Sequence, residues 1–171
     1  MIPIDSCRVP ENSFLARYAV DGNYTDCYST TIASEVSLAE FATAFYTTRL
    51  FKLERTILKW AVSKPSTDLE ARRVADALLD TFAAWTVEQR NSSEILMCDF
   101  RSRTRSWLKV ELRQVACETE SQLFFGSAVV QRRASRPDKF PRRLAYNALI
   151  GFHKIYSRLL LRAAKDNLSN A

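Results

Sequence analysis

Few side chains in this sequence can move protons near neutral pH. His153 is the one histidine, and histidine is the side chain that changes charge between pH 5 and 8. Tyr156 follows three residues later, which places both on roughly the same side of a helix. A proton-handling pair facing a cavity is one interpretation. The sequence favours the other, in which His153 borders an apolar stripe and bonds to a carbonyl or to water, because no orienting partner is apparent.

Carboxylates and large aromatic side chains supply the other candidates. Four carboxylates lie in strand-like runs, where an unpaired buried charge is costly, so each must be solvated or paired: Asp26, Glu88, Asp99 and Glu111. Many arginines lie nearby in the sequence, which favours an ion ladder on the outer face of a sheet over a polar cavity floor. Trp85 and Trp107 stand in strands between polar neighbours. The candidate ligand contacts are therefore Asp26, Tyr28, Trp85, Asp99, Trp107, His153 and Tyr156.

Several reaction classes are excluded by composition. The chain has three glycines, so a phosphate-binding loop, a dinucleotide fingerprint and a nucleophile elbow cannot be built. Its four cysteines are scattered without a CxxC pair and are expected to be free thiols, with no zinc site. One histidine excludes a multi-histidine metal centre within the chain. No catalytic residue, metal ligand or cofactor is assigned from the sequence.

Size and charge indicate one globular domain, residues 1–171. Hydrophobic residues make up 47% and charged residues 26%, which is typical of a chain with a real core. No apolar run approaches the ~20 residues of a membrane span, and the first residues do not resemble a signal peptide, so a cytoplasmic location is expected. The net charge of +6 lies largely after Arg132. A solvated helix face explains this excess better than a nucleic-acid patch does.

The first half of the chain predicts an arm, a strand and helices. Residues 1–22 are irregular, with prolines and Gly22 between short apolar pieces, and residues 24–32 form a first strand. Ser37 with Glu40 is a capping box, so a helix begins there and breaks near residues 47–48. A second capping box joins Thr67 to Glu70. Two or three helices are therefore expected before the next strands.

The second half predicts strands and a closing helix. The hydrophobic period changes to two, and the runs 82–90, 93–101, 105–114 and 122–131 are joined by turns too short for parallel crossovers. They indicate an antiparallel meander. Gly126 suggests a close backbone approach in the last strand, and Gly151 suggests tight packing of the closing helix, 141–165. The apolar stripe expected on that helix is Leu144, Ala148, Phe152, Ile155, Leu159 and Ala163, widened by Tyr156 and Leu160.

This order predicts an α+β fold in which a curved antiparallel sheet wraps around the long C-terminal helix. The segments NYTDCY, LFFGSAVV and LIGFHKIYSRLLLRAA resemble a bacterial family, a domain of unknown function. That family is similar to the START-like helix-grip superfamily, which includes polyketide cyclases and lipid-transfer domains. The resemblance covers roughly residues 24–164. It implies a sheet gripping the helix, with a cavity between them that often takes hydrophobic ligands, and it assigns no catalytic residue.

Three functional hypotheses follow. The favoured one is a non-enzymatic module that binds a small hydrophobic or amphipathic ligand between the sheet and the closing helix. The second is a cyclase or hydratase-type enzyme that uses Asp26, Asp99 or His153 with a tyrosine as acid and base. The third is an interaction protein that docks on anionic surfaces through Arg132, Arg133 and Arg136.

Overall fold

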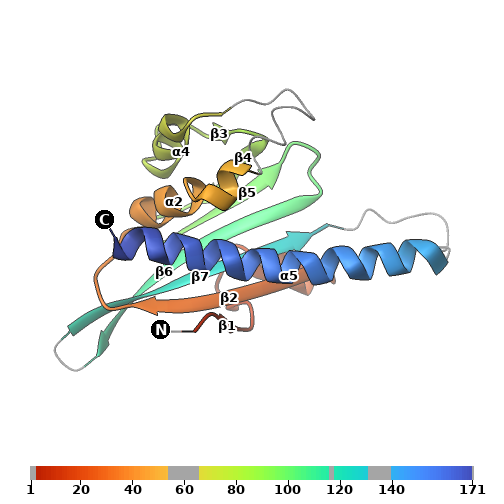
Figure 1. Cartoon of the computed structure of the whole chain (residues 1–171), viewed down its shortest axis with the longest axis horizontal. Helices are drawn as coiled ribbons and strands as arrows, with labels where there is room; N and C mark the ends of the chain where they lie inside the picture. Colours follow the sequence, from red (N-terminus) through yellow and green to blue (C-terminus); the bar gives the residue numbers. More distant parts are fainter. Residues whose placement is uncertain (1–2, 54–65, 116–117, 131–139, 171) are drawn as a thin grey trace.

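The computed structural model describes residues 3–53, 66–115, 118–130 and 140–170, with the backbone alone for residues 140–150 and 152. It is an α+β fold with an open, antiparallel, seven-stranded sheet in the order β1-β2-β7-β6-β5-β4-β3 and a long C-terminal helix (Figure 1). The strands are β1 (Asp5–Ser6), β2 (Tyr24–Ile32), β3 (Thr81–Phe82), β4 (Trp85–Arg90), β5 (Glu94–Asp99), β6 (Thr104–Val115) and β7 (Glu118–Val129).

The strand predictions are confirmed in outline and corrected at one turn. The first strand spans residues 24–32 as predicted, and β3 to β7 form the antiparallel meander. The run 82–90 is not one strand, because Ala83 has a φ of 54° and turns the chain between β3 and β4. A left-handed residue cannot continue a strand. β2 pairs antiparallel with β7, the last strand of the meander.

The helices begin where the capping boxes predict. In α2 (Leu38–Tyr46) the Ser37 hydroxyl accepts from the Glu40 amide and the Glu40 carboxylate accepts from the Ser37 amide. The same exchange starts α4 (Asp68–Ala75). α2 ends at Tyr46, where the break was expected. The closing helix α5 (Phe140–Ser169) extends beyond the predicted end, and the arm predicted to be irregular contains β1 and a short helix, α1 (Ala16–Val20).

Helices α2 and α5 lie on one face of the sheet, which we call the helix side (Figure 1). The core there joins Phe45 of α2 and Leu161 of α5 to Phe125 of β7. The stripe predicted for α5 is wrong at Ile155 and Leu159, which are 61% and 48% exposed, and correct at Leu160, which is buried. The side chains predicted at positions 144, 148 and 152 lie outside the described part. The buried side of the described part is turned by about one residue, to Ser157, Leu160, Leu161 and Ala164. α5 packs on both α2 and the sheet, so its buried side is set by two neighbours.

The opposite face of the sheet, the arm side, is covered by the N-terminal arm and α1. Leu15 and Tyr18 pack there with Trp107 in a second core. Buried Glu94 accepts hydrogen bonds from the Trp107 Nε1 (2.7 Å) and from the Phe14 amide (3.0 Å). Its carboxyl group therefore links the arm to the sheet. Ion pairs lie around this core, as predicted for Glu88 and Glu111: Glu88 pairs with Arg17 and Arg105, and Glu111 with Lys109. The same prediction is wrong for Asp26, which faces the helix side, and for Asp99, which accepts from turn amides.

Gly126 of β7 and Gly151 of α5 give opposite expectations when changed to alanine. A Cβ at Gly126 would lie 2.6 Å from Leu15 Cδ2 and 2.9 Å from the Asp26 carbonyl oxygen, so the predicted close approach is confirmed. A Cβ at Gly151 meets no described atom within 4 Å, so the tight packing predicted there is wrong.

We therefore expect Gly126→Ala to lower the free energy of unfolding by about 1–3 kcal/mol through overpacking. Gly151→Ala, the matched control, should raise it by roughly 0.5–1 kcal/mol, because alanine is the better helix former. Urea denaturation of both variants measures this. Equal stability of the two would contradict the close packing of Gly126.

Candidate functional site

The helix side of the sheet changes character from one cross-strand row to the next. One row is apolar and consists of Tyr28, Phe125 and Leu108. The adjacent row, nearer the beginning of β2, contains Asp26, Ser127 and Ser106. Residues two apart on a strand share a face, so both rows face the helices. A polar row thus follows directly on the apolar core.

Three side chains of this region form a hydrogen-bonded group that we call the Asp26 cluster: Asp26, Ser127 and His153. The Ser127 Oγ lies 2.6 Å from Asp26 Oδ1 and 2.7 Å from His153 Nε2. His153 Nε2 is also 3.6 Å from Asp26 Oδ2. The Ser127 amide (3.2 Å) and the Tyr24 hydroxyl (3.4 Å) donate to the same carboxylate. The cluster joins residues that are up to 127 positions apart in the chain, from three elements.

Hydrogen-bond chemistry determines the direction of these bonds. An ionised carboxylate only accepts, so the single Ser127 proton is donated to Asp26. The Ser127 oxygen then accepts from His153, which carries a proton on Nε2. A serine nucleophile requires the reverse, a hydroxyl that donates to an unprotonated imidazole nitrogen. In addition, Asp26 Oδ2 lies 3.6 Å from the same Nε2, whereas the carboxylate of a triad bonds to Nδ1. The cluster is therefore a relay ending at Asp26 and not a Ser-His-Asp hydrolytic triad.

Strand pairing and helix direction place these residues. In the antiparallel ladder Asp26 stands directly opposite Ser127. α5 runs along β2 in the same direction (Figure 1), so successive positions on the two elements meet. The Arg158 guanidinium lies 5.2 Å from the centre of the Tyr28 ring, further along both elements than the contact of His153 with Asp26. His153 therefore stands over the polar row.

Tyr28 adds a buried phenol beside the cluster. Its side chain is 2% exposed. Burial, reinforced by the negative charge of Asp26, raises the pKa of Tyr28 to about 12, against about 10 for a free tyrosine. The phenol is therefore a hydrogen-bond donor over the whole neutral range. Tyr156 of α5 is half-buried and packs against the same core.

Two predicted candidates lie elsewhere. Trp107 is fully buried on the arm side, where it donates to Glu94. Asp99 accepts from the amides of Arg103 (2.6 Å) and Thr104 (2.9 Å) and so closes the turn between β5 and β6. Neither contacts the Asp26 cluster, because strand parity puts Trp107 on the other face and the turn occupies Asp99.

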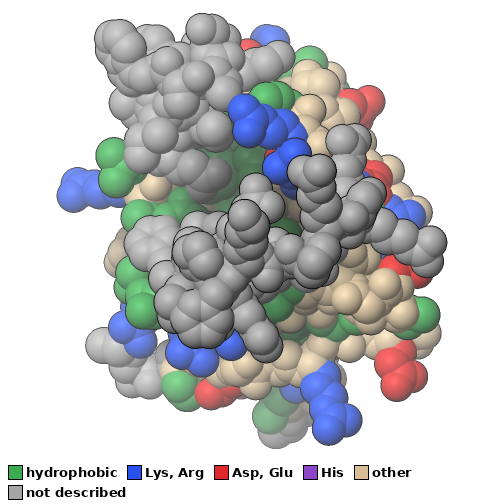
Figure 2. Space-filling view, turned by 90° about the vertical axis from the view of Figure 1, so that its right-hand side faces the viewer, with side chains coloured by type: hydrophobic (Ala, Val, Ile, Leu, Met, Phe, Trp, Pro, Cys, Tyr) green, Lys and Arg blue, Asp and Glu red, His purple; other side chains and the backbone are tan. Residues whose placement is uncertain are grey.

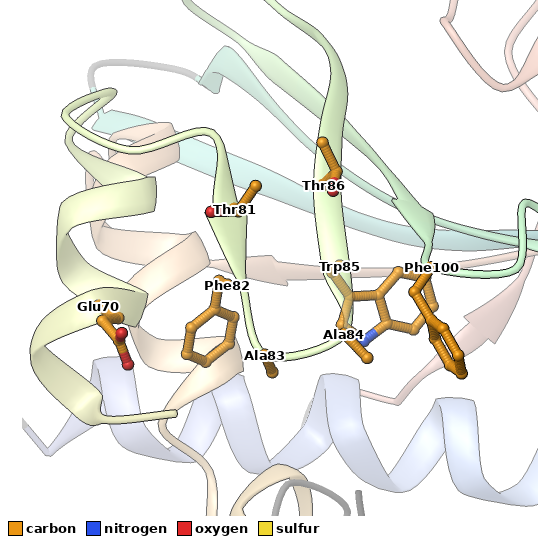
Figure 3. A pocket seen from close by; sticks show the side chains of 8 residues that line it. All are labelled: Glu70, Thr81, Phe82, Ala83, Ala84, Trp85, Thr86 and Phe100. Carbon is orange, nitrogen blue, oxygen red and sulfur yellow. The ribbon is translucent and has the colours of Figure 1, made fainter. Parts of the chain in front are cut away.

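Trp85 lies at a separate hollow of about 240 Å³ (Figure 3). The residues that line it come from the β3–β4 hairpin, from α4 and from the turn after β5: Glu70, Thr81, Phe82, Ala83, Ala84, Trp85, Thr86 and Phe100. The indole Nε1 of Trp85 is buried without a partner among the described groups. Four strand spacings separate β2 from β4, so this hollow is roughly 19 Å from the Asp26 cluster. None of the described residues that line it comes from α5, in contrast to the cavity expected between sheet and helix.

Ser127 is the cluster member that the sequence reasoning missed. In the sequence Ser127 stands out as a polar residue, directly after a glycine, within the otherwise apolar run of β7. In the structure it pairs directly with Asp26. Within the described ranges, no three metal-ligating side chains gather closely enough to hold an ion. In the same ranges no helix is both long and apolar enough to cross a membrane.

The raised pKa of Tyr28 gives stability a defined pH dependence. Between pH 10 and 12 the unfolded chain releases the phenolic proton while the folded protein keeps it, so the free energy of unfolding should fall as pH rises through this window. Tyr28→Phe should flatten the fall, as measured by urea denaturation from pH 8 to 12. Asp26→Asn should move the ionisation of Tyr28 to lower pH in an ultraviolet titration. An unchanged slope in Tyr28→Phe would contradict the assignment.

The chain was compared with protein families, curated proteins and solved structures. No protein-family model matches the chain, and no similar curated protein or solved structure is found.

Proposed function

We propose that this protein is a binding module for a small amphipathic molecule, held between the helix side of the sheet and α5. Its polar group would bond to the Asp26 cluster. The observation that supports this is the polar row of Asp26 and Ser127, set beside an apolar core and met by the single histidine of the chain.

Burial within the cluster is unequal, and this indicates how a ligand would reach it. The Asp26 side chain is 7% exposed, and its several donors offset the cost of removing it from water. The His153 side chain is 32% exposed, so it is the accessible member. A ligand hydroxyl suits this residue, because a neutral ring that carries its proton on Nε2 has Nδ1 as an acceptor to which that hydroxyl can donate.

The apolar part of the ligand would lie beyond the cluster, toward the end of the sheet. The next residues on this face are Tyr24 and Val129, which pair with each other and are half-buried. The backbone of α5 continues past this end of the sheet (Figure 1). Figure 2 looks onto the end from which α5 projects and shows scattered hydrophobic side chains where the surface is described. A polar group with an apolar region on one side fits an amphipathic ligand.

The proposed scaffold is the helix-grip, START-like one. A C-terminal helix that lies along an open antiparallel sheet, with further helices between the first strand and the meander, supports this assignment. Under α5 residues 160–164 the described side chains form a packed core. The ligand site is therefore assigned to the His153 end of the helix and not to its C-terminal half.

One observation favours a second candidate, a cyclase or hydratase-type enzyme. Asp26, Tyr28 and His153, the acid and base candidates of that hypothesis, converge on one place, whereas Asp99 does not. A carboxylate, a protonated phenol and an imidazole can transfer protons to and from a bound hydroxyl. The arginines of the third hypothesis, Arg132, Arg133 and Arg136, lie outside the described residues.

Binding can be tested with a fluorescent long-chain alcohol as the probe. His153→Leu and Ser127→Ala should each raise the dissociation constant of the probe about 3- to 10-fold, which is the effect of one lost hydrogen bond. Lys154→Gln, an exposed neighbour on α5, should leave it unchanged. Thermal unfolding of each variant verifies the fold. Equal affinity in all four proteins, or no binding by any, would overturn the proposal.

Native mass spectrometry of protein purified without detergent tests the same site without a chosen probe. A retained apolar molecule in the wild type, absent from His153→Leu, is the expected result. Chromatography of the alcohol after incubation separates the two candidate functions. Recovery of unchanged alcohol supports a binding module, whereas its dehydration would transfer support to the enzyme.

A further inference from the structure

Cys7 of the N-terminal arm and Cys27 of β2 are neighbours across a strand pair. Asp5 and Ser6 of β1 pair with Ser29 and Tyr28, so Cys7 is the next residue along and faces Cys27. The Cys7 amide donates to the Cys27 carbonyl at 3.0 Å, which continues the pairing. The two Sγ atoms are 3.0 Å apart, and both residues are free thiols.

This geometry already meets most requirements of a disulfide. Facing residues on antiparallel strands have Cα atoms about 4.5–5.5 Å apart, inside the range that disulfides span. The sulfur atoms need to approach by about 1 Å to reach the bonding distance of ~2.05 Å. Cys27 is 2% exposed and packs in the arm-side core, whereas Cys7 is half-exposed. An incoming reagent therefore meets Cys7 first.

We propose that Cys7 and Cys27 form a thiol-disulfide modification site, at which a small-molecule disulfide oxidises the pair and ties the N-terminal arm to β2. The Cys7 thiolate attacks one sulfur of the reagent, whose S–S bond breaks and whose other half leaves as a thiolate that takes up a proton. Cys27 then loses its proton to solvent and attacks the Cys7 sulfur. The second half of the reagent leaves in the same way. Two protein thiols are oxidised to one disulfide while the reagent is reduced to two thiols.

The two thiols have different roles in this reaction: Cys7 attacks the reagent, and Cys27 resolves the mixed disulfide. The hydrogen bond with Cys27 lowers the pKa of the Cys7 thiol, which increases the fraction of the attacking thiolate. The same bond, together with burial, raises the pKa of Cys27. Cys27 therefore stays protonated until Cys7 has reacted, and then serves as the resolving thiol.

A disulfide between Cys7 and Cys27 would affect the arm side of the sheet. The arm contributes Leu15 and Tyr18 to that core, and the short strand β1 pairs it with β2. A bond between Cys7 and Cys27 closes a loop over the residues between them and keeps the arm in place. The site is independent of the proposed ligand, because Cys27 faces the arm side while Asp26 and Tyr28 face the helices.

Oxidised glutathione is the probe for the test. After incubation of the reduced, folded protein at pH 8, the intact mass should fall by that of two hydrogen atoms. Digestion with trypsin without reductant should yield the peptide 1–8 joined to the peptide 18–49. The melting temperature should rise by about 5–10 °C, as expected for a closed loop of this length in a domain of this size.

Two variants make the result specific. Cys98→Ser, which removes a free thiol that bonds to the Asp99 carbonyl, should still lose two hydrogens. Cys7→Ser should neither lose them nor gain thermal stability on treatment. A stable glutathione adduct on Cys7 with Cys27 still alkylatable would overturn the proposal. A disulfide-linked peptide pair that contains Cys98 or Cys117, without a link between Cys7 and Cys27, would also overturn the proposal.

Discussion

The pairing of β2 with β7 is the constraint on which the rest of this structure depends. It joins the first long strand of the chain to the last, over nine facing residue pairs from Tyr24 with Val129 to Ile32 with Ser121. Without it the meander would end in an open edge at β7 and the arm would have no strand to follow. The pairing also needs Gly126, because Leu15 and the Asp26 carbonyl leave no room for a side chain at that position.

Because successive residues of a strand point to opposite faces, β2 supplies two different environments from three adjacent positions. Asp26 and Tyr28 face α5, and Cys27 between them faces the arm. A shift of the β2 register by one residue would exchange these environments, placing a carboxylate in the arm-side core and a thiol under the helix. The proposed ligand group and the proposed disulfide thus rely on the same register while using opposite sides of the sheet.

Local signals predicted the parts of the fold whose cause is local. Two capping boxes located the starts of α2 and α4, since a serine or threonine and a glutamate three residues later satisfy the free amides by themselves. A run of residues with high β-propensity located β2 within its observed bounds. The turn at Ala83 escaped prediction, because alanine seldom adopts a positive φ and gives no sign of doing so. The buried side of α5 was also missed, because leucines occur on both sides of that helix and packing on α2 and the sheet selects one of them.

The sequence by itself determined the inventory of this protein: a single histidine, few glycines, four separated cysteines, a first strand with Asp26 and Tyr28 on one face, and a long closing helix. Those facts limit the chemistry, because side-chain types and near-neighbour spacing are properties of the chain alone. Only the tertiary structure decided which of these residues meet. Ser127 joins Asp26 to His153, and Cys7 meets Cys27, through contacts between segments far apart in the chain. Such contacts depend on strand order and register, which result from the packing of the whole domain and not from any local pattern.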